Sequence, residues 1–133
     1  MSQENVEMVR RAYEAFNRGD RDAAVADLAA DCEYVASGAI PGATGIYSGP
    51  GGFKRFTEWL LDEFNDARVE INETIDAGDQ VVVSVTSRGS GKHSGVETSW
   101  VTWQVWTFRA GKAVRGEGFR SRGAALEAAG LSE

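Results

Sequence analysis

The sequence predicts an α+β fold in which a curved, antiparallel-rich sheet is closed by three N-terminal helices into a cone-shaped barrel. Two observations carry this prediction. Apolar residues recur at helical spacing as far as residue 65, whereas from residue 67 they alternate with period two. Helices that precede a run of strands are typical of α+β folds. Long strands joined by tight turns twist, so we expect this sheet to curl around an interior.

Composition limits the classes of partner. The chain of 133 residues has the length of one domain, 1–133, and carries a formal net charge of −6. This acidic balance disfavours a nucleic-acid partner and an anionic membrane surface, because both attract basic proteins. The sequence shows no signal-peptide pattern and no apolar run of the roughly 20 residues that span a membrane. Together with a single cysteine, Cys32, these features favour a cytoplasmic protein.

Three helices are predicted in the first half of the chain. The first begins with Ser2 as its N-cap and ends near Gly19, and the second covers residues 21–29 after the N-cap Asp20. The third covers residues 52–65. Each helix has one apolar stripe that faces the core. In order, these stripes comprise Val6, Val9, Tyr13 and Phe16; Ala24, Val25 and Leu28; and Phe53, Phe56, Leu60 and Phe64.

The other elements are strands, one long loop and a C-terminal helix. A short strand at residues 33–35 precedes a loop at residues 37–51, which contains both prolines and is long enough to form a lid or a pocket wall. Ser121 caps the last helix and Gly130 closes it. Four longer strands are predicted at residues 67–76, 80–88, 96–109 and 112–120.

The segment SWVTWQVWTF at residues 99–108 holds three of the four tryptophans and is apolar on both faces. Because side chains alternate across a strand, one face carries Trp100, Thr102, Gln104, Trp106 and Phe108, and the other carries Val101, Trp103, Val105 and Thr107. We expect the first face to line a pocket for a small apolar ligand. An exposed patch of Val101, Trp103 and Val105 marks an interface, so we expect a homodimer. A register slip of one residue would exchange the two faces.

Several side chains are candidates for the pocket. Gln104 is either a buried amide satisfied by a neighbour or a hydrogen-bonding group for a ligand. Tyr34 is either a core residue or a ligand contact, and Trp59 either roofs the pocket or packs on a loop. The expected lining comprises Tyr13, Tyr34, Phe56, Trp59, Trp100, Thr102, Gln104 and Trp106.

Glu117 is the candidate for acid–base chemistry. Glu117 and Arg120 face opposite sides of a regular strand, and ordinary solvated charges are the favoured interpretation of both. A Glu117 inside an aromatic pocket would instead have a raised pKa and act as a general acid or base. No metal site is expected, because the chain has one cysteine and one histidine, His93, which lies in a Gly/Ser-rich turn. No cofactor is expected either, since no phosphate-binding glycine motif occurs.

Four separated segments resemble the nuclear transport factor 2-like superfamily, and its SnoaL-like and ketosteroid isomerase-like branches in particular. The segments are ENVEMVRRAYEAFNRGD (4–20), DLAADCEY (27–34), DAGDQVVV (76–83) and TFRAGKAVRGEGFRSRGAALEAAGL (107–131). Together they cover nearly the whole chain in the same order. The resemblance implies a cone-shaped α+β barrel with an internal pocket, and dimerisation through the sheet.

The catalytic acids of such relatives are not matched. Ketosteroid isomerases place a base at the position of Ala36, a second acid at Gln104 and a tyrosine at Ala12, one residue before Tyr13. Epoxide hydrolases and SnoaL-like relatives place acids at positions that match Gly118 or Ser121. An amide such as Gln104 can donate a hydrogen bond to an oxyanion, but it cannot titrate.

The sequence therefore predicts a small-molecule-binding SnoaL-like protein with an apolar pocket and no assigned specific function. The alternative is an isomerase, cyclase or hydrolase that acts without a metal on a small polyketide-, steroid- or terpenoid-like substrate. A titratable side chain that points into the cavity would favour the alternative, because acid–base catalysis needs such a group.

Overall fold

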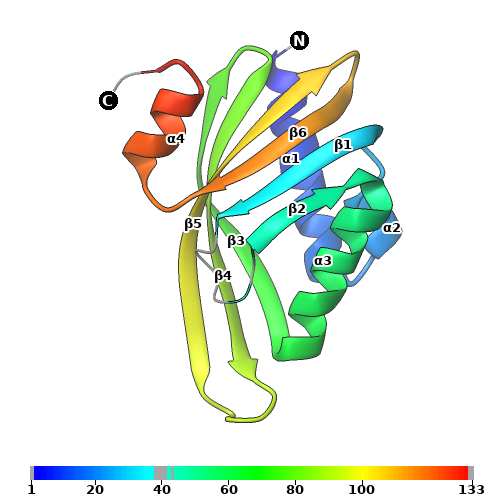
Figure 1. Ribbon diagram of the computed structural model, residues 1–133, viewed down its shortest axis with the longest axis vertical. Helices are drawn as coiled ribbons and strands as arrows, with labels where there is room; N and C mark the ends of the chain where they lie inside the picture. Colours follow the sequence, from blue (N-terminus) through cyan, green and yellow to red (C-terminus); the bar gives the residue numbers. More distant parts are fainter. Residues whose placement is uncertain (1, 38–41, 43, 132–133) are drawn as a thin grey trace.

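The computed structural model describes residues 2–37, 42 and 44–131 (Figure 1). The described elements in chain order are α1 (Ser2–Arg18), α2 (Arg21–Ala24), β1 (Leu28–Ser37), β2 (Thr44–Ser48), α3 (Gly49–Glu63), β3 (Phe64–Ala77), β4 (Gln80–Gly91), β5 (Glu97–Arg109), β6 (Lys112–Phe119) and α4 (Arg122–Ala128). Three helices thus precede the run of long strands, and the predicted α+β fold is confirmed.

The described strands form one six-stranded sheet in the order β2-β1-β6-β5-β4-β3. Neighbouring strands are antiparallel except β1 and β6, which run parallel and place Tyr34 opposite Gly116. In the antiparallel pair of β4 and β5, Val83 lies opposite Gln104. Residues directly opposite each other point to the same side of a sheet, so Gln104 faces the side that the valine side chain helps to fill.

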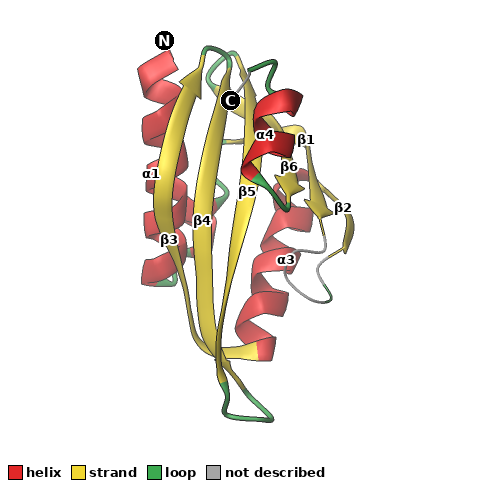
Figure 2. Cartoon of the chain, turned by 90° about the vertical axis from the view of Figure 1, so that its left-hand side faces the viewer, coloured by secondary structure: helices red, strands yellow, loops and turns green. Residues whose placement is uncertain are grey.

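Helices cover both faces of the sheet. Helices α1 and α3 lie on the concave face and α4 lies on the other face (Figures 1 and 2). Val81, Val83 and Val85 of β4 belong to the core under α1 and α3, whereas Val82 packs with Leu126 of α4. The sequence predicted that three N-terminal helices close the barrel and assigned no face to the C-terminal helix. Val82 and Val105 make part of the outer face of β4 and β5 apolar, and the C-terminal helix covers this part.

Most helix ends follow the predicted capping pattern, but Ser2, the predicted N-cap of the first helix, is itself the first residue of α1. Gly19 ends α1 with φ at +80°, a conformation that glycine adopts without steric cost. Asp20 and Ser121 each accept a hydrogen bond from the backbone N–H three residues later, so both predicted N-caps are confirmed. At the end of α4, the N–H of Leu131 donates to the carbonyl oxygen of Leu126 at 2.8 Å.

The boundary between α2 and β1 differs from the prediction. The helix expected over residues 21–29 ends at Ala24, and the strand expected over 33–35 spans Leu28–Ser37. The cause is a pairing partner far along the chain. Leu28 lies opposite Ala113 of β6, and the N–H of Ala113 donates to the carbonyl oxygen of Asp27 at 2.8 Å. A hydrogen bond to such a distant strand leaves no local signal in the sequence.

The segment predicted as a loop at residues 37–51 contains further structure. Thr44–Ser48 forms β2, which pairs with β1 in antiparallel register. Helix α3 begins at Gly49, three residues before the predicted start, with Pro50 in its first turn, where proline is well tolerated. Residues 38–41 and 43 of the predicted lid lie outside the described part of the chain.

Candidate functional site

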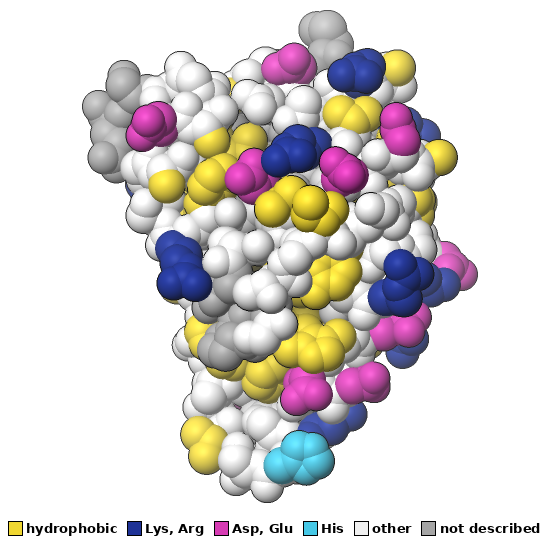
Figure 3. Space-filling model, in the orientation of Figure 1, with side chains coloured by type: hydrophobic (Ala, Val, Ile, Leu, Met, Phe, Trp, Pro, Cys, Tyr) yellow, Lys and Arg dark blue, Asp and Glu magenta, His cyan; other side chains and the backbone are white. Residues whose placement is uncertain are grey.

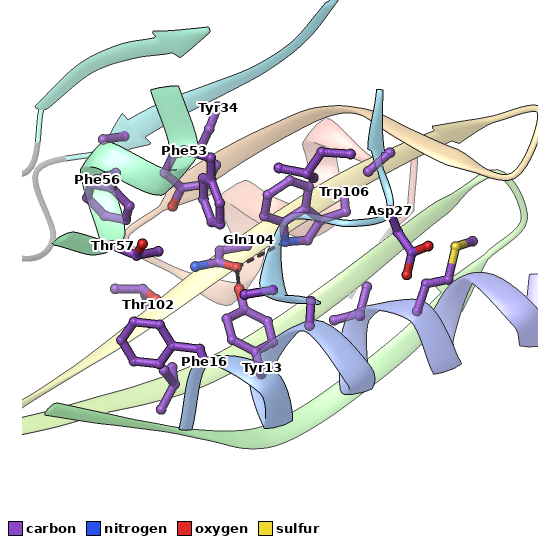
Figure 4. Close-up of a pocket in the computed structure, with 18 of the residues that line it drawn as sticks. Tyr13, Phe16, Asp27, Tyr34, Phe53, Phe56, Thr57, Thr102, Gln104 and Trp106 are labelled. Carbon is purple, nitrogen blue, oxygen red and sulfur yellow. Dashed lines mark hydrogen bonds between the residues drawn. The ribbon is translucent and has the colours of Figure 1, made fainter. Parts of the chain in front are cut away.

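A cavity of about 90 Å³ lies between α1, α3 and the concave face of the sheet (Figure 4). Its walls come from nearly every element on that side. Most of the lining is apolar. The lining residues are Met8, Val9, Ala12, Tyr13, Phe16, Ala24, Asp27, Leu28, Tyr34, Ala36, Ser37, Phe53, Phe56, Thr57, Leu60, Val69, Ser87, Thr102, Gln104, Trp106, Phe108 and Ala113.

Aromatic rings form one wall of the cavity. Tyr34 of β1 stacks on Trp106 of β5, with ring centroids 5.5 Å apart. Phe53 of α3 meets the edge of both rings, and Phe56 packs beside Tyr34 at 5.5 Å. The absence of a side chain at Gly116 creates the room for this wall, because a Cβ there would lie 2.5 Å from the Trp106 ring. The wall is therefore held rigidly between sheet and helix.

The centre of the cavity holds a hydrogen-bonded group around Gln104. The hydroxyl of Tyr13 and the indole Nε1–H of Trp106 both donate to Oε1 of Gln104, the latter at 3.0 Å. Gln104 is only 9% exposed. Both acceptor positions of its amide oxygen are thus occupied by protein donors. Of the two predicted roles for Gln104, the contacts of this oxygen match a buried amide that its neighbours satisfy.

Burial controls the ionisation of the two tyrosines in the cavity. Desolvation raises the pKa of Tyr13 well above its ordinary value, while hydrogen bonds to Trp106 and Gln104 act in the opposite direction. Desolvation raises the pKa of Tyr34 in the same way, and a hydrogen bond to Gln104 again opposes the rise. Both phenols are therefore neutral at physiological pH, and each can donate a hydrogen bond but cannot accept a proton.

Thr102 faces the same cavity as Gln104, but its side chain differs in hydrogen bonding. It is 5% exposed, and its Oγ1 is buried without a hydrogen-bond partner among the described residues. Thr57, on the opposing helix α3, also lines the cavity, but its hydroxyl donates to the carbonyl oxygen of Lys54 at 2.7 Å. Within the described lining, Thr102 thus offers a hydroxyl that the protein itself leaves unused.

Asp27 brings a carboxylate to the cavity wall, and it is the one charged residue in the described lining. It lies between α2 and β1, and Arg11 of α1 pairs with it at 3.6 Å. Sequence reasoning placed Asp27 inside a helix and missed this role. The pairing of Leu28 with β6, described above, brings Asp27 to the cavity wall, with its side chain 38% exposed.

Comparison with known proteins identifies the family. The model of the SnoaL-like domain family matches residues 9–116, which is most of the chain. The chain belongs to the SnoaL-like domain family. This result confirms the resemblance inferred from the separated segments. No protein of curated function matches this SnoaL-like domain.

Solved structures with the same fold are similar over nearly the full chain. A nuclear transport factor 2-like protein of unknown function from Burkholderia pseudomallei is 27% identical, with a TM-score of 0.78 and 96% of each chain covered. TerC, co-crystallised with polyporic acid, is 26% identical, with a TM-score of 0.77 over 96% of this chain and 98% of TerC. A Catenulispora acidiphila protein with a ketosteroid isomerase-like fold is 20% identical, with a TM-score of 0.75 over 94% of this chain and 93% of its own, which shows the fold alone.

The SnoaL-like domain brings six of the predicted lining residues together and leaves two outside. Trp59 is not in the lining. It stacks on the far side of Phe56, with centroids 6.2 Å apart. Trp100 is also outside, because it packs against Phe64 at the start of β3, with centroids 5.2 Å apart. The six that line the cavity are Tyr13, Tyr34, Phe56, Thr102, Gln104 and Trp106.

Glu117 does not face the cavity. It lies opposite Val105 in the pairing of β5 and β6 and so shares the outer face of the sheet. There its carboxylate forms an ion pair with Arg115 at 3.0 Å. Glu117 therefore lies outside the pocket, where the acid–base hypothesis required it, and is a charge on the outer face of the sheet.

The outer face of β5 is partly covered within the chain. Val105 is 5% exposed, because it packs with Leu126 of α4. Trp103 packs against the same cluster, and the guanidinium of Arg122 lies 5.9 Å from its ring centroid. Val101 is 56% exposed. Of the patch predicted to meet a second subunit, α4 thus covers Val105 and part of Trp103, and Val101 stays open.

Other candidate sites lie away from the cavity or are not found. His93, the single histidine, lies in the turn between β4 and β5 at the tip of the molecule (Figure 3). On the face that Figure 3 shows, apolar and charged side chains are interspersed. Among the described residues, no cluster of three or more His, Cys, Asp or Glu could hold a metal ion, and no helix is long and apolar enough to cross a membrane.

Proposed function

We propose that this SnoaL-like domain binds a small, largely apolar ring compound in the cavity between α1, α3 and the sheet. The observation that carries the proposal is an apolar space of about 90 Å³ beside a wall of aromatic rings, with hydrogen-bonding groups within it. Ligand sites in proteins have this composition, with mostly hydrophobic walls and a few polar groups that orient the ligand.

A relative with a ligand supports the proposal. TerC, which is 26% identical and similar over 96% of this chain, was co-crystallised with polyporic acid. The alignment covers all elements that build the cavity, because it extends over nearly the whole of both chains. The likeness favours binding of an organic molecule as the shared property and leaves the identity of the ligand open.

The size of the cavity narrows the ligand class. Drug-sized ligands occupy pockets of roughly 300–1,000 Å³, and an engineered cavity of about 150 Å³ holds one benzene. The cavity of about 90 Å³ is smaller than both. A one-ring compound therefore fits after small shifts of the lining side chains, whereas a steroid-sized molecule requires the walls to separate.

The proposal is tested by titrating benzene into the protein and following the indole N–H resonance of Trp106 by NMR. Ala12 of α1 lines the cavity, so Ala12→Leu fills the space from the helix side. We expect saturable binding to the wild type and at least a tenfold loss in Ala12→Leu, with folding checked by thermal melting. Ala128→Leu, on the exposed side of α4, serves as the matched control. Equal binding by Ala12→Leu and the wild type would exclude this cavity as the site.

A catalytic function is the second candidate, and Asp27 is the observation that favours it. Its carboxylate lines the cavity, where it can accept a proton from a bound carbon acid. The test is exchange of the α-protons of cyclohexenone in D₂O, followed by NMR. If the protein catalyses this exchange and Asp27→Asn abolishes it, the protein is an enzyme that removes a proton from carbon. Equal exchange rates with and without protein would exclude proton abstraction from this substrate.

We also propose that two copies pair through the outer face of the sheet, in the cytoplasm. Val101 supports this assembly, since it is a large apolar side chain that is 56% exposed in the middle of β5. The reducing cytoplasm suits the buried free thiol of Cys32. Light scattering at micromolar concentration tests the dimer. A monomeric mass, unchanged in Val101→Asp, would exclude this interface.

A further inference from the structure

The hydroxyl of Thr102 is an unexplained feature of the cavity. Thr102 is 5% exposed, and its Oγ1 has no hydrogen-bond partner among the described residues. A buried hydroxyl without a partner destabilises the folded state, and valine has nearly the same shape without this cost. A polar group kept at such a position points to a partner that is not part of the chain.

Two other oxygen atoms of the lining already have partners within the protein. The amide oxygen of Gln104 accepts from Tyr13 and Trp106, and the hydroxyl of Thr57 donates to Lys54. Their hydrogen bonds hold the walls of the cavity in place. A ligand that donated a hydrogen bond to the amide oxygen of Gln104 would have to displace Tyr13 or Trp106, whereas the hydroxyl of Thr102 has no internal partner to displace.

The strand pairing of Thr102 determines which side of the sheet its hydroxyl faces. Thr102 lies opposite Val85 in the pairing of β4 and β5, two residues before Gln104 on the same face. In the view of Figure 4, its side chain is drawn among the lining residues between Thr57 of α3 and Phe16 of α1. The unused hydroxyl thus belongs to a cavity whose lining also includes the aromatic rings of Phe16 and Phe56.

We infer that Thr102 is the residue that selects the ligand's polar group, and that the ligand is an aromatic or cyclic compound with a hydroxyl or carbonyl oxygen on its ring. The inference rests on the proposed function and adds the chemical class of the ligand. The ring packs among the aromatic side chains, and its oxygen exchanges a hydrogen bond with Oγ1 of Thr102. A neutral hydroxyl suits either a donor or an acceptor on the ligand.

The test compares phenol with benzene, which differ by one hydroxyl. Dissociation constants for both are measured by NMR or calorimetry on the wild type and on Thr102→Val. We expect the preference for phenol over benzene to fall about 3- to 10-fold in Thr102→Val, with benzene binding unchanged or tighter. The matched control is Thr107→Val, which lies on the same strand but faces outward and accepts from Gln80 at 3.1 Å. It should keep the wild-type preference.

A second measurement separates this role from a purely structural one. If Oγ1 of Thr102 lacks a partner in the free protein, Thr102→Val raises the melting temperature by roughly 3 °C or more, because the unpaired hydroxyl is removed. A threonine that served the fold would instead lose stability on this change. A higher melting temperature together with a smaller preference for phenol over benzene in Thr102→Val is the result expected if this hydroxyl serves to bind the ligand.

The possible failures are distinguishable. If benzene binds the wild type but the preference for phenol is the same in Thr102→Val, the cavity binds ligands and Thr102 does not select them. If Thr102→Val lowers the melting temperature, the hydroxyl has a structural partner and the inference is wrong. If neither probe binds the wild type, the proposed function fails and this inference fails with it.

Discussion

The hydroxyl of Tyr13 on α1 donates to Oε1 of Gln104 on β5 and so joins the helical layer to the sheet across the cavity (Figure 4). Trp106 donates to the same oxygen from two residues along the strand. One amide therefore fixes a helix, a strand and an aromatic wall in a single arrangement. Because an amide does not titrate, the ability of Gln104 to accept these two hydrogen bonds does not itself change with pH.

Replacing Gln104 with leucine should destabilise the protein. The change leaves the donors of Tyr13 and Trp106 buried without an acceptor, and each unsatisfied buried donor costs about 1–3 kcal/mol. We expect the free energy of unfolding to fall by about 2–4 kcal/mol in urea titrations. Gln80→Leu, at the half-buried edge of β4, is the control and should change it by less than about 1 kcal/mol. An increase in stability of Gln104→Leu would contradict the hydrogen-bonded arrangement.

The protein should lose stability at alkaline pH. Burial raises the pKa of Tyr13 and Tyr34 above the unfolded value near 10, and it raises that of Cys32 to about 11. Above the unfolded pKa values the unfolded chain releases protons that the folded state retains, so unfolding becomes more favourable as pH rises. The slope begins about one pH unit below the unfolded pKa, which means near pH 8 for Cys32, with an ordinary value of 9.0, and near pH 9 for the two tyrosines.

Urea titrations between pH 8 and pH 11 measure this effect. Each tyrosine that remains protonated only in the folded state contributes up to about 1.4 kcal/mol of lost stability per pH unit above pH 10. The slope should be shallower in Tyr34→Phe, where one such group is removed. Constant stability across this range would show that the two phenols ionise equally in the folded and unfolded chain.

Gly116→Ala should disturb the aromatic wall. A Cβ at this position lies 2.5 Å from the Trp106 ring, so the indole must move and its bond to Gln104 weakens. We expect a loss of about 1–3 kcal/mol in unfolding free energy, as for other overpacked cores, and a shift in tryptophan fluorescence. Gly51→Ala, in the exposed first turn of α3, meets no close atom and is the control. Unchanged fluorescence in Gly116→Ala would contradict the close contact.

Leu126→Ala should uncover the outer face of the sheet. Leu126 is 3% exposed and packs with Val82 and Val105, so its truncation should cost about 2–4 kcal/mol. Because Val105 and Trp103 then become accessible, self-association in light scattering should increase. Leu131→Ala, at a side chain that is 36% exposed, should cost less than about 1 kcal/mol. Equal effects of the two variants would show that α4 does not cover this face.

Patterns that act locally predicted much of the fold. The period-two alternation placed Thr102, Gln104 and Trp106 on one face of β5, and capping residues such as Asp20 and Ser121 marked the helix starts. The features that were missed depend on contacts between distant segments. The early start of β1 depends on β6, and the cover over the outer face depends on a helix that follows the last strand.

For the site too, local patterns predicted part of the structure, and contacts between distant segments decided the rest. Six lining residues followed from periodicity and resemblance, because a strand or helix face is readable from spacing. Asp27 was missed, since the hydrogen bond that ends α2 early comes from Ala113. Alternation placed Trp100 on the face of Gln104, and Trp59 was expected either to roof the pocket or to pack on a loop. A shared face does not show where along a strand or helix the cavity ends.

The parallel pairing of β1 with β6 has a consequence for how the cavity arises during synthesis. Before β6 leaves the ribosome, β1 can pair only with its short neighbour β2, so the central seam of the sheet stays open. The wall that carries Tyr34 therefore cannot meet Trp106 until residue 119 has been made. Contacts of such long sequence separation form late and slowly. A nascent chain that ends before this point should be recognised as unfinished by chaperones and should have no ligand site.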